Sequence, residues 1–168
     1  MIRPSSKFAR LGAAAVSAGA LLWATSVGTQ PLGGAQPLVG ARYLSAGEVH
    51  ALVAKLTDGV ATAAVPTGPG AVVLAAHRDR TGQVEVHVRL NDELIGQAGR
   101  ASVRVGGTVA GNRETAPGEW RGGEITGGKT YDLGPGDVIW IPAGMPHQMI
   151  VPAGGSIHYL AVKFEVRP

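Results

Sequence analysis

Two histidines in this sequence could present their imidazoles to a cavity. In residues 84–89 valines alternate with polar side chains, so His87 and Arg89 share one face of an expected strand. Residues 135–146 have the pattern of a tight turn, a buried strand and a second rigid turn, which together fix the position of His147. The chain has no cysteine, so any metal ion must be held by histidine, carboxylate or water.

The composition favours many short strands around one core. A chain of 168 residues suits a single domain, and 26 Gly, 11 Pro and a charged fraction of 16% describe a turn-rich sequence. Period-two patterns between turn signals predict an all-β, double-sheet barrel over residues 71–168, with an irregular connection at 106–123. The expected strands are residues 71–76, 84–88, 101–105, 123–126, 130–133, 137–141, 147–151 and 156–166.

One α-helix is expected before the barrel, within a segment of linker and helix at residues 36–70. Ser45 and Glu48 have the spacing of a capping box, and apolar residues follow at helical intervals. Asp58 and Gly59 would end the helix. We expect this helix to pack against the outside of the barrel.

Residues 1–35 have the parts of a secretory signal peptide and a short linker. Arg3, Lys7 and Arg10 supply a positive start, residues 11–27 form an uncharged apolar run, and small residues follow. A retained membrane anchor is the alternative. We expect cleavage near the end of this segment, no stable membrane span afterwards, and a secreted, cell-envelope or periplasmic protein.

The net charge of +3 comes from that positive start. Without its three basic residues, twelve basic residues balance twelve acidic ones and no basic cluster remains, so nucleic acid is not an expected partner. The sequence also lacks a glycine-rich phosphate loop before a helix, a Gly-x-Ser-x-Gly turn and paired histidines on a helix. Nucleotide binding and hydrolase chemistry are therefore not indicated.

The spacing around His147 resembles the second conserved motif of the cupin family. That motif has a Gly, five residues, a Pro, one residue, a second Gly, two residues and a His, and Gly136, Pro142, Gly144 and His147 fill these places. The Asn that follows in many members is Val151 here. Further glycine-rich segments at 118–122 and 127–128 resemble a bacterial cupin subgroup whose members often carry export signals.

The first cupin motif is matched only in part. His87 lies at the expected distance after a glycine, Arg89 stands where the second His of the motif would be, and Glu93 falls at the carboxylate position with Asp92 beside it. The glycine that closes the motif, Gly99, comes one residue early.

The resemblance implies a divalent metal ion, usually iron, manganese, nickel, zinc or copper, on His87, Glu93 and His147, with Asp92 as the alternative carboxylate. Two imidazoles and a carboxylate suit ferrous iron with open positions. Arg89 cannot donate a lone pair to a metal. It would bind a substrate carboxylate, or else the site is degenerate, with Arg89 paired to Glu93 and His147 satisfied by the backbone.

Two further residues are candidates for substrate binding. Trp140 lies beside the second motif and could line the cavity wall, and His158 could face the cavity from the final strand, with core packing as the alternative for both. The resulting hypothesis is an exported, homodimeric cupin that binds a small carboxylated or oxygenated molecule, as a metal-dependent oxygenase, isomerase or lyase. The alternative is a metal-free, non-catalytic binding or stabilising module.

Overall fold

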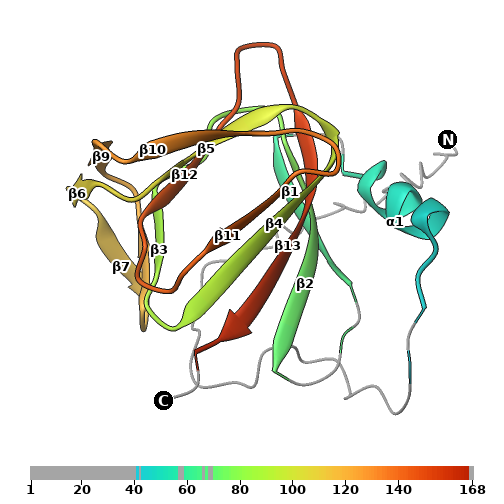
Figure 1. The fold of residues 1–168 in the computed structure, drawn as a ribbon, viewed down its shortest axis with the longest axis horizontal. Coiled ribbons are helices and arrows are strands. Elements are labelled where there is room, and N and C mark those ends of the chain that lie inside the picture. Colours follow the sequence, from blue (N-terminus) through green and yellow to red (C-terminus); the bar gives the residue numbers. More distant parts are fainter. Residues whose placement is uncertain (1–40, 42, 57–58, 66, 68–69, 167–168) are drawn as a thin grey trace, which may run out of the picture.

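Antiparallel strands make up most of the structure, a computed structural model that describes residues 41, 43–56, 59–65, 67 and 70–166 (Figure 1). The expected signal peptide at residues 1–35 lies outside the described residues. The elements in chain order are α1 (Ala46–Val53), β1 (Val60–Val65), β2 (Ala71–Arg78), β3 (Glu85–His87), β4 (Leu90–Gly99), β5 (Ala101–Val105), β6 (Thr108–Ala110), β7 (Arg113–Ala116), β8 (Glu119–Arg121), β9 (Glu124–Thr126), β10 (Lys129–Leu133), β11 (Val138–Ile141), β12 (His147–Ile150) and β13 (Ile157–Glu165).

The strands form two facing sheets. One has five strands in the order β1-β2-β13-β4-β11, the other has six in the order β10-β5-β12-β3-β8-β7, and β6 and β9 form a separate two-stranded ribbon. Strands far apart in the chain are neighbours, since β13 pairs with both β2 and β4. This arrangement confirms the expected all-β, double-sheet barrel with one N-terminal helix among the described residues.

The helix α1 begins at the expected capping box. The Ser45 hydroxyl accepts from the Glu48 amide at 3.2 Å, and the Glu48 carboxylate accepts from the Ser45 amide at 2.8 Å, so both free donors are satisfied. Val53 is buried, and α1 lies beside β2 on the outside of the barrel (Figure 1). Within the described part of the chain, no helix has the length and apolar character needed to cross a bilayer.

Several strands lie where the sequence indicated linker or irregular structure. β1 falls inside the segment expected to be linker and helix, and it pairs with β2 as the edge of the five-stranded sheet. β7 and β8 occupy the connection expected to be irregular. β4 was not expected because polar residues interrupt its pattern, but its buried Asp92 faces a polar part of the interior.

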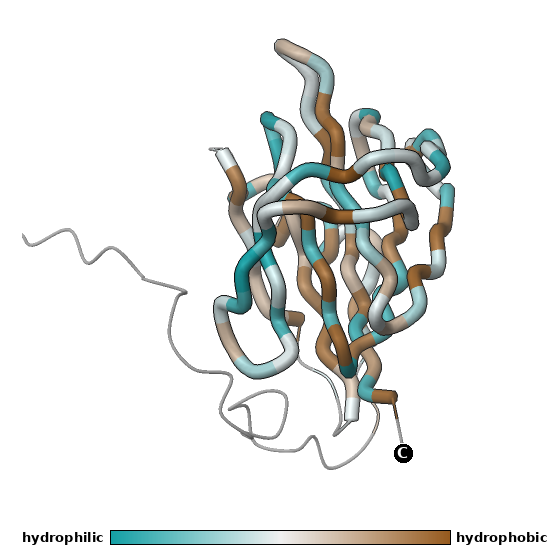
Figure 2. Tube along the Cα trace, turned by 90° about the vertical axis from the view of Figure 1, so that its left-hand side faces the viewer, coloured by the Kyte–Doolittle hydropathy of each residue, from teal (hydrophilic) through white to brown (hydrophobic). Residues whose placement is uncertain are grey.

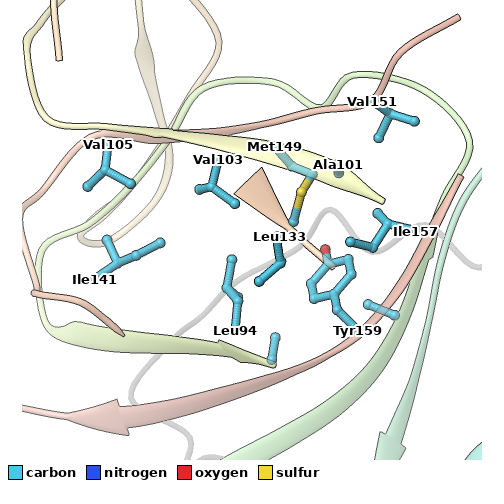
Figure 3. Packing of buried hydrophobic residues seen from close by; sticks show 12 residues of the cluster. Leu94, Ala101, Val103, Val105, Leu133, Ile141, Met149, Val151, Ile157 and Tyr159 are labelled. Carbon is cyan, nitrogen blue, oxygen red and sulfur yellow. The ribbon is translucent and has the colours of Figure 1, made fainter. Parts of the chain in front are cut away.

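The apolar core fills the barrel interior between the two sheets. Apolar and polar residues alternate along the strands (Figure 2), and the inward apolar side chains pack between the sheets (Figure 3). Leu133, Ile141 and Ile157 are at most 1% exposed, and burial of each stabilises the fold by about 1.5–3 kcal/mol. The buried apolar cluster consists of Ala76, Leu94, Ala101, Val103, Val105, Leu133, Ile141, Met149, Val151, Ile157, Tyr159 and Ala161.

The two turns around β11 have the geometry that the sequence requires. Gly136 and Gly144 adopt φ values of +85° and +77°, in the left-handed region that favours glycine. The Gly144 amide donates to the His87 carbonyl at 2.7 Å, which ties the second turn to the end of β3. The backbone thereby holds His147, at the start of β12, close to His87.

Candidate functional site

Four strands place polar side chains in the barrel interior beside the apolar core. β3 carries Glu85 and His87, β4 carries Asp92, β12 begins with His147, and β13 carries Lys163 near its end. His147 is the cross-strand partner of Glu85, and Lys163 is that of Asp92. Because each pair belongs to a different sheet, the cluster joins the two sheets across the interior.

The donor atoms of this cluster are spaced as ligands of one ion. The Nε2 atom of His87 lies 3.4 Å from Glu85 Oε2 and 3.4 Å from Asp92 Oδ2. The Nε2 atom of His147 lies 4.0 Å and 3.7 Å from the same two oxygens. Two donors at about 2.1 Å from one ion and at a tetrahedral angle are about 3.4 Å apart. The ligand atoms of Glu85, His87 and His147 lie within 4.8 Å of one another and therefore fit a metal ion. Asp92 lies outside that group of three, but its Oδ2 atom is close to both imidazoles.

Each histidine is oriented by a partner on its other ring nitrogen. His87 Nδ1 lies 2.6 Å from Glu119 Oε2, and His147 Nδ1 lies 3.1 Å from the Met145 carbonyl. An Nδ1–H that donates to a carboxylate or carbonyl leaves the Nε2 lone pair for a metal, and metal-binding histidines are usually held in this way. The residues present therefore fit a divalent ion in both their spacing and their support.

Cationic side chains already bind the carboxylates of the cluster. Arg78 Nη2 donates to Glu85 Oε1 at 3.0 Å, and Arg121 Nη1 donates to Glu85 Oε2 at 2.6 Å. Burial alone would raise the pKa of Glu85, but His87 and Arg121 hold it well below its ordinary value. Asp92 is 3% exposed at its side chain, and its pKa is also lowered, because His87 and Lys163 outweigh the effect of burial.

The two histidines have opposite protonation tendencies. Burial would lower the pKa of His87, but the carboxylates of Asp92, Glu119 and Glu85 outweigh it and raise that pKa to about 10. For His147 burial dominates and lowers the pKa, so this imidazole is neutral. Without a metal, the cluster thus holds one charged and one neutral imidazole.

A cavity of about 190 Å³ lies beside these donors. It is smaller than the range of about 300–1,000 Å³ common for larger organic ligands, so it suits a small molecule. Its lining combines apolar side chains with charged side chains of both signs. The lining residues are Thr62, Leu74, Ala76, Arg78, Glu85, Asp92, Leu94, Arg121, His147, Met149, Tyr159, Ala161 and Lys163.

The structure brings His87 and His147 together but not Glu93 or Arg89. Glu93 lies between buried Asp92 and buried Leu94 on β4, so its side chain points to the other face of the sheet. Arg89 is exposed, because β3 ends at His87 and the chain bends before β4 begins. The proposed roles of Glu93 as metal ligand and Arg89 as carboxylate anchor do not fit this geometry.

Trp140 and His158 lie away from the cavity. Trp140 is 50% exposed on β11 and its ring lies 6.0 Å from that of Phe164, so it lines a separate surface groove. His158 alternates with buried Ile157 and Tyr159 and contacts His77, with the two rings tilted and their centroids 4.6 Å apart. Both positions follow from the outward phase of their strands.

Glu85, Lys163, Arg121 and Glu119 belong to the site although the sequence analysis did not assign them to it. A signal for Glu85 was present. If Glu85 and His87 are aligned with the paired histidines of the first cupin motif, Asp92 takes the carboxylate position, and Gly99 follows at the full spacing of six intervening residues. No local pattern marks Lys163, whose partner Asp92 is 71 residues away.

Comparisons with known proteins agree with the fold. Residues 126–167 match the family model described as AraC-like ligand binding domain. An uncharacterized conserved protein with a double-stranded β-helix domain from Klebsiella pneumoniae is 15% identical, with a TM-score of 0.50 over 75% of this chain and 91% of that one. The protein TT1209 from Thermus thermophilus is 19% identical, with a TM-score of 0.49 over 69% and 95% of the two chains. No curated protein sequence matches.

The two facing sheets and the polar cavity between them define a double-stranded β-helix domain. The chain has the double-stranded β-helix fold of the cupin proteins, with the motif at residues 136–147 on two of its turns.

Proposed function

We propose that this protein binds a small organic acid beside a divalent metal ion inside its barrel. The observation that carries the proposal is the pair of imidazoles whose Nδ1 atoms are occupied by Glu119 and Met145 and whose Nε2 atoms face two carboxylates.

Glu85, His87 and His147 would hold the ion, with Asp92, which lies beside both imidazoles, as a further ligand. Nitrogen and oxygen donors suit iron, manganese, nickel, zinc or copper. A bound ion would act as a Lewis acid toward an oxygen of the organic ligand. The chain's own residues would orient the ligand, because Arg121 and Lys163 line the same cavity. Such a site supports an oxygenase, an isomerase or a lyase.

A metal-free binding module is the second candidate. The observation in its favour is that Arg78, Arg121 and Lys163 already neutralise Glu85 and Asp92 at distances of 2.6–3.0 Å. In that case the cavity would bind its ligand through these cations alone.

Metal content separates the two candidates. The purified full chain, loaded with ferrous iron, manganese or zinc and then desalted, should retain about one equivalent of metal. The double variant His87→Ala/His147→Ala should retain less than about a tenth, because it lacks both nitrogen ligands. His158→Ala, which removes an outward-facing histidine, is the matched control and should retain as much metal as the wild type. Equal metal content in the double variant would refute the assignment, and a metal-free wild type would favour the second candidate.

We also propose that two copies pair through the outer surface at β11. Val138 and Trp140 are 56% and 50% exposed on this edge strand of the five-stranded sheet. An exposed apolar edge invites pairing with a second chain. Trp140→Glu should convert a dimer to a monomer in light scattering, whereas Val60→Glu on the opposite edge of the same sheet should not. A wild-type monomer would contradict the proposal.

The proposed export rests on residues 1–35 alone. Fused to a phosphatase that is active only outside the cytoplasm, this segment should give activity, and neutralising Arg3, Lys7 and Arg10 should reduce it. An inactive fusion that is nevertheless expressed would contradict export.

A further inference from the structure

The positively charged ammonium group of Lys163 lies next to the donor atoms of the proposed metal site. Its Nζ atom lies 2.7 Å and 2.6 Å from the two carboxylate oxygens of Asp92 and 3.1 Å from His87 Nε2. The Asp92 side chain is 3% exposed and that of Lys163 is 16% exposed. The ammonium group therefore binds one proposed ligand with both oxygens and touches another.

The strand pairing places this lysine directly beside Asp92. Lys163 is the cross-strand partner of Asp92, and the two inward side chains rise from neighbouring positions on β13 and β4. Leu94 and Ala161, the next inward pair, belong to the apolar core and close off that side. In the absence of a metal, the short bonds to Asp92 are the available compensation for its buried charge.

We infer that Lys163 is a tethered cation that competes with the metal ion for Asp92, so that metal can occupy the site only when this ammonium group moves away. The inference rests on the proposed metal site and adds its regulation. Two positive charges cannot share one buried carboxylate at this distance without strong repulsion. The affinity of the wild-type site for a divalent ion is therefore set below that of its ligands alone.

Zinc affinity of the full chain, measured by competition with a chromophoric chelator, tests this inference. Lys163→Met keeps the length of the side chain and removes its charge, and it should bind Zn²⁺ at least about tenfold more tightly than the wild type. Lys129→Met is the matched control, because Lys129 lies over the Tyr131 ring away from the cavity, and its zinc affinity should equal that of the wild type. Equal or weaker zinc binding by Lys163→Met would overturn the inference while leaving the metal site intact. Zinc binding by neither protein would refute the metal site and the inference together.

A labelling experiment on the wild type does not depend on the folding of a variant. Under mild acetylation followed by mass spectrometry, Lys163 should react much more slowly than exposed Lys55 and Lys129 in metal-free protein. Saturation with Zn²⁺ should accelerate acetylation of Lys163 several-fold and leave Lys55 and Lys129 unchanged. An unchanged rate at Lys163 in protein shown to hold one equivalent of zinc would overturn the inference.

Discussion

Metal binding should release about one proton from the cluster at pH 7.5. In the metal-free chain the pKa of His87 is about 10, because its three carboxylate neighbours outweigh burial and the opposing charge of Lys163. Nearly every molecule then carries a proton on this imidazole, and a metal ligand must give it up. His147 contributes no proton, because its pKa is lowered. One released proton makes the apparent metal affinity rise by about tenfold per pH unit between about pH 6.5 and 8.5.

Titration calorimetry with Zn²⁺ measures this proton directly. At one pH, the observed enthalpy is plotted against the ionisation enthalpy of several buffers that do not bind metal, and the slope is the number of protons released. Glu119→Gln is an informative comparison, because loss of this carboxylate at His87 Nδ1 lowers the pKa of His87 and ends proton release at a lower pH. An enthalpy that does not depend on the buffer at pH 7.5, together with an affinity that is flat with pH, would refute the reasoning.

Three further predictions concern stability. In metal-free protein the pKa of His87 rises from 6.5 to about 10 on folding. The free energy of unfolding should therefore fall as the pH rises from about 6.5 to 10, by at most about 1.4 kcal/mol per pH unit. Urea titrations of the wild type at pH 7 and pH 9 should show this fall, and those of His87→Gln should not. His77→Leu should raise the unfolding free energy by about 1 kcal/mol, because both ring nitrogens of the buried His77 lack a hydrogen-bond partner among the described residues; a loss of thermal stability would contradict this. Gly96→Ala should cost more than about 3 kcal/mol, because its Cβ would lie 1.9 Å from the Gly134 carbonyl oxygen. Gly136→Ala meets open space and should cost only about 1–2 kcal/mol for its positive φ; similar losses in the two variants would be inconsistent with the close contact.

Local signals in the sequence predicted the parts of the fold that depend on neighbouring residues. The capping box marks the start of α1 because its two hydrogen bonds join residues three apart. The glycines and prolines of residues 136–147 predict two turns around one strand because each restricts its own backbone. The alternation in residues 84–88 predicted that His87 points away from the valines, because neighbouring side chains point to opposite faces of a strand, and His87 is buried in the interior.

The same alternation failed one residue pair later. It was extended to Arg89, but β3 ends at His87, and the bend turns Arg89 out to solvent. With the first cupin motif aligned on His87 and Arg89, its carboxylate position falls on Glu93, which faces the other side of β4, and not on Asp92. A strand ends where its pairing ends, and the pairing of β3 with β8 and β12 is not visible in a local pattern.

The sequence alone thus determined the double-sheet fold and the two imidazoles, since turns, period and motif spacing are properties of short segments. Only the tertiary structure decided which charges surround them. Glu119 reaches His87 because β8 pairs with β3, and Lys163 reaches Asp92 because β13 pairs with β4. These contacts join residues 32 and 71 positions apart, and they come from sheet pairing and burial of the common core rather than from any local preference.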